Sequence, residues 1–428
     1  MAKEKLLTTK LQLAPLLGMA IFFSGFNGLR VYENVTFGDV LLMIVGAMWV
    51  LSWPLSRHSK LLWSTVASFM LFVLAYIFEG LFSGDIVGEK NSIELMKFLT
   101  SFYLLNYLIS DLSKSDHAIR SLMIAYGASG IVNAVIGIAD ASSLTDIGAW
   151  LHVRTVNDYS FGTRAHGLTM HPNHMAQHSA MALFLIIGLL KQKDSSVKRI
   201  LKVAVALVLL LGVLASGSRG ALLSVLVVGT LLCFIYLRKL YRYRSATLIS
   251  VAAIMCGFAV TVTLNLNQPI FGAWDRLLQE SDDVQESNET RLRAYDLAWQ
   301  DFTAYMFAGS GYSSISGAHN IYLQILQSAG LLGMAGLLLY FVVPIWNVRS
   351  LLKYKNLDNL ILGVVSSVGI FLVSGLVENM IYVRSALIPM GFLWALIRLH
   401  RTQHLSAEAI GAIKYNGLIV RGSLRSET

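Results

Sequence analysis

The chain has 428 residues, of which 55% are hydrophobic and 14% are charged, and its mean hydropathy is +0.61. Soluble domains carry about 25% charged residues, so this composition excludes a soluble globular fold and predicts a protein surrounded by lipid. The two cysteines, Cys233 and Cys256, lie in apolar runs, which excludes a disulfide framework and a Cys-ligated metal site. The net charge of +9 then indicates unequal loops across a bilayer rather than nucleic-acid binding.

Apolar stretches follow one another along the chain, and a helix needs about 20 such residues to cross the hydrocarbon core. The first stretch follows a lysine-rich start, as in a signal peptide, but it lacks a small-residue cleavage site and is predicted to remain as a span. The sequence predicts an all-α polytopic membrane protein with about 12 transmembrane helices. They are expected near residues 11–29, 37–55, 61–82, 93–111, 119–139, 174–190, 200–215, 220–237, 246–264, 320–346, 359–377 and 380–397.

Basic residues gather in every second connection, and the more basic side is expected to be cytoplasmic. About 24 of the 34 Lys and Arg residues fall on that side, together with both termini. The other side, called the outer side below, is predicted to be periplasmic or extracellular. We expect a transmembrane domain over residues 1–397, with long outer loops at 140–173 and 265–319, and a basic cytoplasmic tail over residues 398–428.

The second outer loop contains a pattern typical of an amphipathic helix. Between Glu289 and Phe307, apolar side chains recur among charged ones, which predicts a helix lying along the membrane surface. Arg291 and Arg293 stand beside Glu289 and either form surface ion pairs with it or contribute to a site. Long loops carry function more often than short ones, so these segments hold the first candidate residues.

Arg219 occupies a tight turn, Ala215–Gly220, with the sequence Ala-Ser-Gly-Ser-Arg-Gly between two predicted spans. An arginine at the membrane edge costs a few kcal/mol and is usually retained for a partner or a ligand. The alternative is that its side chain only reaches to the interface. Because small residues such as Ser218 expose backbone N–H groups beside the guanidinium, we expect an anion site that suits phosphate oxygens.

The segment before the sixth predicted span concentrates polar groups at one interface. Its histidines lie at 166, 171 and 174, but no Cys or acidic residue accompanies them, and Pro172 would interrupt a helix that aligned them. The sequence therefore favours a capped helix start with hydrogen-bonded histidines over a metal site. Arg164 in the same segment is predicted to act with Arg219, because two guanidinium groups can neutralise a diphosphate.

His319 and Asn320 end the second outer loop and open the tenth predicted span. A histidine at the mouth of an outer cavity can serve as a general base near neutral pH, although a lone interfacial histidine is most often structural. Gly330 and Gly333 are expected within the helix, where they would allow another helix to pack closely. Farther along the chain, Glu378 is expected to pair with Arg384 as a structural bridge.

Three of these segments together resemble one family. The segment His319–Gly333 has the pattern His-Asn, nine residues, Gly, two residues, Gly, and resembles a signature of bacterial O-antigen ligases and the related O-antigen polymerases. The turn Ser218–Gly220 and the segment Arg164–Asn173 resemble other motifs of that family, in the same order and on the same side. The resemblance covers about residues 150–345, and the first five predicted spans match only as membrane helices.

The resemblance implies a membrane glycosyltransferase fold of the GT-C type with a large periplasmic loop. It also implies transfer of a glycan from undecaprenyl diphosphate or another polyprenyl diphosphate to an acceptor hydroxyl, with no metal or other cofactor. His319 would deprotonate or orient the acceptor hydroxyl. The diphosphate would be held by Arg164, Arg219 and Arg291 or Arg293, with His171, Asn173, Ser218 and Asn320 in support.

The same resemblance places the protein in a bacterial inner membrane, with its active site on the periplasmic face. The expected partners are a polyprenyl-diphosphate-linked glycan donor, an acceptor glycan or lipid A core, membrane lipid and other polysaccharide-assembly proteins, but no nucleic acid. A lipid A core acceptor would make the protein a ligase, and a second lipid-linked repeat would make it a polymerase; both remain open.

A flippase for lipid-linked oligosaccharides, or another polysaccharide transporter, is the alternative from a different class. Transporters of this size place polar groups along a path through the membrane. Here the ionisable residues gather at the outer face, and apart from flanking residues such as Glu79 and Lys97 the spans carry almost none. This distribution favours an enzyme.

Overall fold

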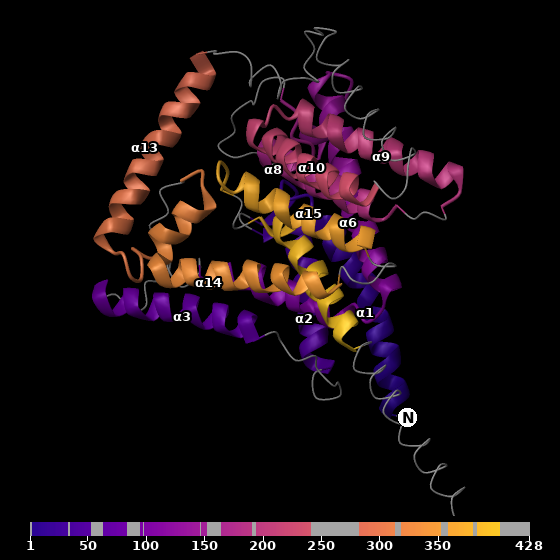
Figure 1. Cartoon of the computed structure of the whole chain (residues 1–428), viewed down its shortest axis with the longest axis horizontal. Coiled ribbons are helices and arrows are strands. Elements are labelled where there is room, and N and C mark those ends of the chain that lie inside the picture. The colour runs from indigo at the N-terminus through magenta and orange to yellow at the C-terminus, as the bar shows by residue number, and fades with distance from the viewer. Residues whose placement is uncertain are drawn as a thin grey trace, which may run out of the picture.

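The computed structural model describes residues 2–32, 35–52, 63–83, 95–96, 98–145, 147–151, 164–190, 194–240, 282–312, 318–351, 358–379 and 383–402. Within these ranges the chain is almost entirely helical (Figure 1). The exception is an antiparallel ribbon of β1 (Arg30–Tyr32) and β2 (Val35–Thr36). A helix satisfies its own backbone hydrogen bonds, which lipid requires. The prediction of an all-α membrane protein is confirmed at this level.

The helices are bounded as follows in chain order. They are α1 (Ala2–Ser24), α2 (Phe37–Ser52), α3 (Trp63–Ser83), the π-helical turn η2 (Thr100–Leu104), α5 (Leu105–Leu112), α6 (Asp116–Ala141), α7 (Ile147–Trp150), α8 (Pro172–Gly188), α9 (Ser196–Ala215), α10 (Arg219–Leu240), α13 (Asp282–Ala304), α14 (Ile321–Leu351) and α15 (Asp358–Ser374). A last helix covers residues 384–402.

Among the described residues, three helical stretches are long and apolar enough to cross a membrane: Trp63–Leu81, Asp116–Ala141 and Ile321–Arg349. Four apolar helices are shorter: Leu13–Ser24, Phe37–Val50, Arg219–Ile235 and Asn359–Ser374. The predicted span at 246–264 lies outside the described residues. The total of about 12 spans and the GT-C type of fold therefore remain predictions.

Helix α8 is the centre of the larger helix group. It packs against α6, α9, α10 and α15, while α1 packs against α2 and α6. Helices α3 and α14 run side by side, and α13 stands at the edge of the molecule, connected to this pair through α14 (Figure 1). A large cluster of apolar side chains is buried between the helices, and buried Ser, Asn and Gln side chains are interspersed with it.

The crossing of α8 and α15 positions the candidate site. The two helices meet at Gly188 and Gly363, where a Cβ atom built on either glycine would lie within 3 Å of the other's Cα. Small residues at such a crossing let backbones approach closely. Gln177 of α8 also donates to the hydroxyl of Ser374 at the end of α15. The beginning of α8 is thereby held next to the end of α15, and the residues that follow α15 face those that open α8.

Backbone hydrogen bonds join connections that the sequence assigned to the outer side. They run from Ala165 N to Ala215 O at 3.0 Å, from Gly28 N to Leu168 O at 2.9 Å, and from Ile321 N to Gly375 O at 2.8 Å. These bonds connect the ends of α1, α9 and α15 with the segments that open α8 and α14. These helix ends therefore lie on one side of the structure, and the assignment of that side to the periplasm remains a prediction.

Helix α14 breaks at Gly330, so the expectation that this glycine lies within a continuous helix was wrong. Its φ of 60° and ψ of −155° are not helical, and a Cβ there would lie 2.5 Å from the carbonyl carbon of Phe307. The break lets the N–H of Leu332 donate to the carbonyl oxygen of Phe307 at 3.2 Å. At Gly333 an added Cβ would lie 2.3 Å from Cβ of Ala329, on the other side of the break, whereas Phe72 of α3 would be in ordinary contact at 3.4 Å.

We predict that Gly330→Ala destabilises the protein by about 1–3 kcal/mol, because a side chain at this φ is strained and would clash with the backbone of Phe307. Gly46→Ala in α2 is the matched control, since a Cβ there meets no atom within 4 Å. Thermal unfolding of both purified variants in detergent measures the difference. Equal unfolding midpoints for Gly330→Ala and the wild type would refute the role given to this break.

Candidate functional site

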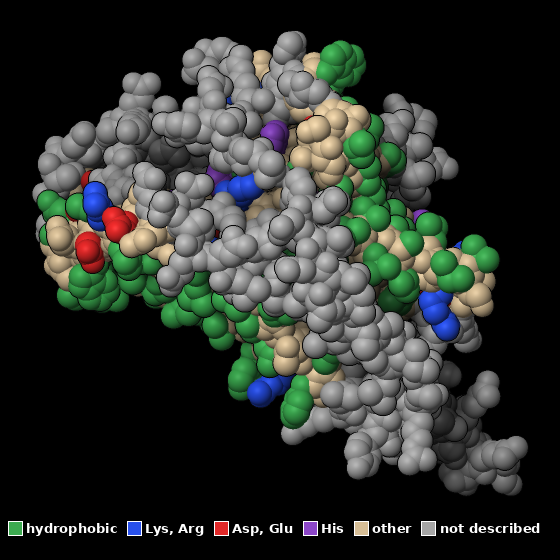
Figure 2. Space-filling view, turned by 90° about the horizontal axis from the view of Figure 1, so that it is seen from above, with side chains coloured by type: hydrophobic (Ala, Val, Ile, Leu, Met, Phe, Trp, Pro, Cys, Tyr) green, Lys and Arg blue, Asp and Glu red, His purple; other side chains and the backbone are tan. Residues whose placement is uncertain are grey.

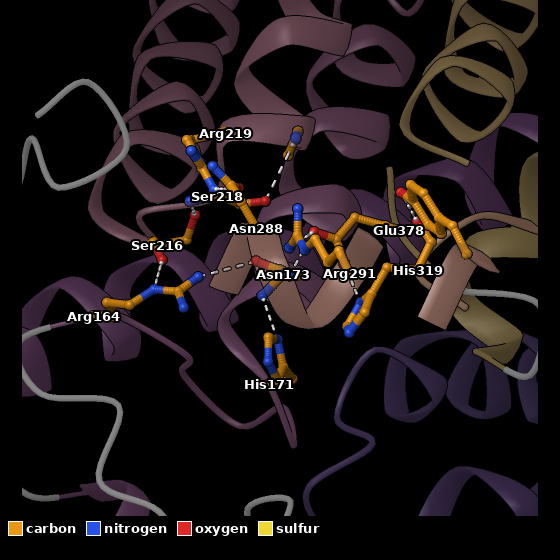
Figure 3. A network of polar contacts seen from close by, with 12 residues as sticks. Arg164, His171, Asn173, Ser216, Ser218, Arg219, Asn288, Arg291, His319 and Glu378 are labelled. Carbon is orange, nitrogen blue, oxygen red and sulfur yellow. Dashed lines mark hydrogen bonds and ion pairs between the residues drawn. The ribbon is translucent and has the colours of Figure 1, made fainter. Parts of the chain in front are cut away.

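Polar side chains from separate outer segments meet around the carboxylate of Glu378, which follows α15 (Figure 3). They are Arg164, His171, Asn173, Ser216, Ser218, Arg219, Asn288, Arg291 and His319. Seen from above, much of the described surface is hydrophobic or uncharged, and Arg or Lys and His side chains gather near its middle (Figure 2). The site therefore combines residues that lie far apart in the sequence.

Glu378 is only 7% exposed and contacts three partners. Its Oε1 accepts a hydrogen bond from Asn173 Nδ2 at 2.6 Å and forms an ion pair with Arg291 Nη2 at 3.2 Å. Its Oε2 lies 3.9 Å from His319 Nδ1. The expected pairing of Glu378 with Arg384 is wrong, because Arg384 instead forms an ion pair with Asp39 at the start of α2.

The surroundings of Glu378 favour its charged form. Burial alone would raise the pKa of this carboxyl group, but contact with His319 and the positive charge of Arg291 outweigh it and hold the pKa below the usual value. Removing one partner of a buried charge pair is strongly destabilising, since the remaining charge has no water to solvate it. The site therefore contains a permanent negative charge at neutral pH that must be matched by cations.

Arg164 is fixed by the turn that precedes α10. Its Nε donates to the carbonyl oxygen of Ser216 at 2.8 Å, and its Nη2 donates to Oδ1 of Asn173 at 3.0 Å. Gly217 in this turn has a φ of +67°, and a Cβ there would lie 3.0 Å from Nε of Arg164. The glycine thus leaves room for the guanidinium group. Asn173 connects Arg164 to Glu378, because its amide contacts both side chains.

Arg219 is the first residue of α10, and Ser218 caps this helix. The hydroxyl oxygen of Ser218 accepts from the N–H of Ala221 at 3.4 Å, and its carbonyl accepts from the N–H of Leu222 at 3.1 Å. The guanidinium of Arg219 donates from Nη2 to Oδ1 of Asn288 in α13 at 2.9 Å. The side chain therefore reaches toward the second outer loop instead of turning back along its own helix.

The helix predicted between Glu289 and Phe307 is present as α13, which runs from Asp282 to Ala304; its position along a membrane surface remains a prediction. Arg291 points from it to Glu378 and is 22% exposed. Arg293 is 81% exposed and lies 3.8 Å from Glu289 on the helix surface. The structure thus brings Arg291 into the group of site residues, whereas Arg293 forms the surface pair that the sequence also allowed.

His319 and Asn320 stand where α14 begins. The carbonyl of His319 accepts from the hydroxyl of Tyr295 in α13 at 3.2 Å, while its side chain remains 40% exposed. Asn320 caps α14, with Oδ1 accepting from Leu323 N at 3.0 Å, and its Nδ2 donates to the carbonyl of Leu376 at 3.0 Å. These bonds hold the histidine between α13 and the segment that carries Glu378.

His171 caps α8, and Pro172 begins the helix rather than interrupting it. Its Nδ1 accepts from the N–H of Asn173 at 3.1 Å, which requires the neutral ring. Burial, with the charges of His174 and Arg164, lowers the pKa of His171 to about 3 against the opposing charge of Glu378. No three His, Cys, Asp or Glu side chains in the described ranges converge as metal ligands.

Several site residues were not found from the sequence. Glu378 was assigned another partner, and neither Asn288 nor Tyr295 was considered. The sequence did contain one signal for Glu378, namely an acidic residue in a short connection between two apolar spans. Nothing in the local sequence distinguishes Asn288 or Tyr295 from other polar residues of α13, because their partners are distant in the chain.

We predict that acid destabilises the protein partly through His171. The unfolded chain binds a proton there near pH 6.5, whereas the folded ring stays neutral to about pH 3, so stability falls as the pH falls below 6.5. His171→Asn, which keeps a capping side chain, should lose less stability between about pH 7 and pH 5. His117→Asn on the exposed surface of α6 should follow the wild type. Identical pH profiles of thermal unfolding for His171→Asn and wild type would contradict this assignment.

Comparison with known proteins agrees with the site. Residues 203–338 match the family described as O-antigen ligase, and none of the curated proteins compared with the chain matches it. The matched segment includes Ser218–Gly220, α13 and His319–Gly333, but not Arg164–Asn173. This match indicates an enzyme of polysaccharide biosynthesis of the ligase or polymerase type. The match of residues 203–338 to the O-antigen ligase family confirms the resemblance that its motifs indicated.

Proposed function

We propose that this protein transfers a glycan from a polyprenyl diphosphate, such as undecaprenyl diphosphate, to a hydroxyl group of an acceptor glycan. The reaction takes place at the periplasmic face of a bacterial inner membrane. The observation that carries the proposal is the convergence of Arg291 and His319 on the buried carboxylate of Glu378. Arg164 is connected to the same carboxylate through Asn173, and Arg219 lies on the adjacent turn. The O-antigen ligase match supports this class of reaction.

The donor must carry its own activation, because the periplasm supplies no nucleotide sugars. A lipid diphosphate does this, since it leaves as a stable anion once its charge is balanced. Arginine side chains suit that task because a planar guanidinium binds phosphate oxygens in a bidentate manner. Arg164, Arg219 and Arg291 come from three different segments and can surround a diphosphate from several directions. They would stabilise the charge that develops on the leaving group without a metal ion.

His319 is assigned the role of base for the acceptor hydroxyl. Its side chain is partly exposed, and Nδ1 faces Glu378, which leaves Nε2 for the acceptor. A carboxylate beside the inner nitrogen of a histidine orients the ring and stabilises the imidazolium that forms. Direct attack of the acceptor oxygen on the anomeric carbon would invert its configuration, since no carboxylate is placed as a covalent nucleophile in this assignment.

The acceptor distinguishes two forms of the same function. Transfer to lipid A core oligosaccharide is a ligase reaction, and transfer to another lipid-linked repeat is a polymerase reaction. The same arginines and histidine serve both, because the donor and the bond that breaks are the same. The product that accumulates in cells lacking the activity therefore identifies the acceptor.

We predict that Arg291→Ala lowers the transfer rate by about 100-fold or more, because an interaction with the developing negative charge is lost. Arg293→Ala on the same helix should keep nearly full activity, since Arg293 is 81% exposed and pairs with Glu289. Glycan transfer by the two purified variants, at equal protein concentration, measures the difference. Equal losses for both arginines would remove the distinction drawn between them.

A second prediction concerns cells that lack the protein. Complementation with His319→Ala or Arg219→Ala, at verified equal expression, should fail to restore surface polysaccharide on lipopolysaccharide gels and in secreted-polysaccharide assays. Accumulation of single repeats would identify a polymerase, and accumulation of unattached long chains would identify a ligase. Full complementation by both variants would reject the proposed site and favour a transporter instead.

A further inference from the structure

Glu378 has two oxygens in unequal environments, and this asymmetry is not explained by a purely structural role. Oε1 has two partners within 3.2 Å, the amide of Asn173 and the guanidinium of Arg291. Oε2 faces Nδ1 of His319 at 3.9 Å, which is longer than a hydrogen bond to a charged group, about 2.7–2.9 Å. The carboxylate is thus held most closely by Asn173 and Arg291, and its contact with His319 is the longest of the three.

The same arginine is the one that the proposed function requires at the diphosphate. A diphosphate carries more negative charge than a carboxylate and offers more oxygens to a guanidinium. Arg291 is 22% exposed, so its side chain can turn toward a ligand on the outer side. When it does so, Glu378 loses its closest cation, while the carboxylate remains 7% exposed and cannot be solvated by water instead.

We propose that Glu378 is a positioning residue that couples donor binding to the base. As the diphosphate draws Arg291 away, Glu378 closes on Nδ1 of His319 and orients the imidazole for the acceptor. This inference rests on the proposed function, because it assigns a donor-dependent role to a residue of that same site. It goes beyond that function in naming a residue, Glu378, that makes the base competent only when the donor is bound.

The transfer step then balances as follows. The acceptor oxygen forms a bond to the anomeric carbon, and its proton passes to Nε2 of His319. The bond between the anomeric carbon and the diphosphate oxygen breaks, and its electron pair leaves on the diphosphate. The positive charge that appears on the imidazole ring is balanced by the carboxylate of Glu378. The positive charge of Arg291 is balanced by the leaving diphosphate. No charge is left unpaired in the buried part of the site.

The packing around the site fits this coupling. Tyr295 of α13 donates to the carbonyl of His319, and the break at Gly330 joins α14 to the end of α13. Arg291 and His319 are therefore carried by elements that are tied to each other. Only side chains need to move when the carboxylate changes partner, and the bond from Asn173 to Oε1 of Glu378 can stay in place.

The test uses the isosteric variant Glu378→Gln, which retains an oxygen for Asn173 and Arg291 but removes the charge. We expect turnover with a polyprenyl-diphosphate-linked glycan to fall by roughly 100-fold. Binding of a synthetic polyprenyl diphosphate should be unchanged or tighter, because the carboxylate no longer competes for Arg291. Glu378→Asp, which keeps the charge, should recover part of the turnover. Glu289→Gln, an exposed acidic residue on α13, is the matched control and should behave as the wild type.

Different results would overturn the coupling role of Glu378 and the proposed function. A parallel loss of diphosphate binding and turnover in Glu378→Gln, with no recovery in Glu378→Asp, would show a scaffold role and overturn the coupling. Unchanged turnover in Glu378→Gln would also overturn it. Failure of the wild type itself to bind polyprenyl diphosphate would reject the proposed function. Thermal unfolding and size-exclusion profiles of each variant establish that the compared proteins are folded.

Discussion

The buried carboxylate of Glu378 is the constraint on which the outer face of this protein depends. A carboxylate that is 7% exposed must be matched by hydrogen bonds and positive charge, because burying it unpaired would cost several kcal/mol. Its partners come from α8, from α13 and from the segment that precedes α14. The need to pair this one carboxylate thus brings together segments that are far apart in the sequence.

In lipid, few interactions other than close helix packing can determine how the site is arranged. Within lipid, helices pack through shape and small residues, since apolar side chains gain nothing by leaving one apolar surrounding for another. The crossing of α8 and α15 at Gly188 and Gly363 is such a contact. It determines which helix ends lie together, and the polar residues at those ends then find their partners. The packing of the helices therefore determines which polar residues can meet at the site.

Features that depend on local pattern were predictable from the sequence. Hydropathy and the periodic pattern of α13 reflect properties of neighbouring residues, and helices are present where these patterns predicted them. The alternation of basic connections concerns orientation in the membrane, which remains a prediction. The candidate residues Arg164, Asn173, Arg291 and His319 do meet in the structure. The motifs identified the family because they join residue types at fixed spacing, and the O-antigen ligase match covers two of the three.

Features that depend on long-range contacts were not predictable. Glu378 and Arg384 are close in sequence, but Glu378 binds Asn173 and Arg291 because helix packing brings them near. Gly330 stands in an apolar run that favours a helix, yet its backbone turns away to meet Phe307. The choice between Arg291 and Arg293 required the direction in which α13 faces. In each instance tertiary contacts outweighed the local preference on which the prediction was based.

The most direct test is release of polyprenyl diphosphate by the purified protein in proteoliposomes, with a lipid-linked oligosaccharide, an acceptor glycan and a chelator of divalent cations. The account predicts one polyprenyl diphosphate released for each glycan transferred, at a rate that the chelator does not change. It also predicts that omission of the acceptor abolishes the release. Transfer that occurs only after a divalent cation is added, or movement of intact donor across the bilayer without release, would contradict an arginine-held diphosphate and a histidine base at this site.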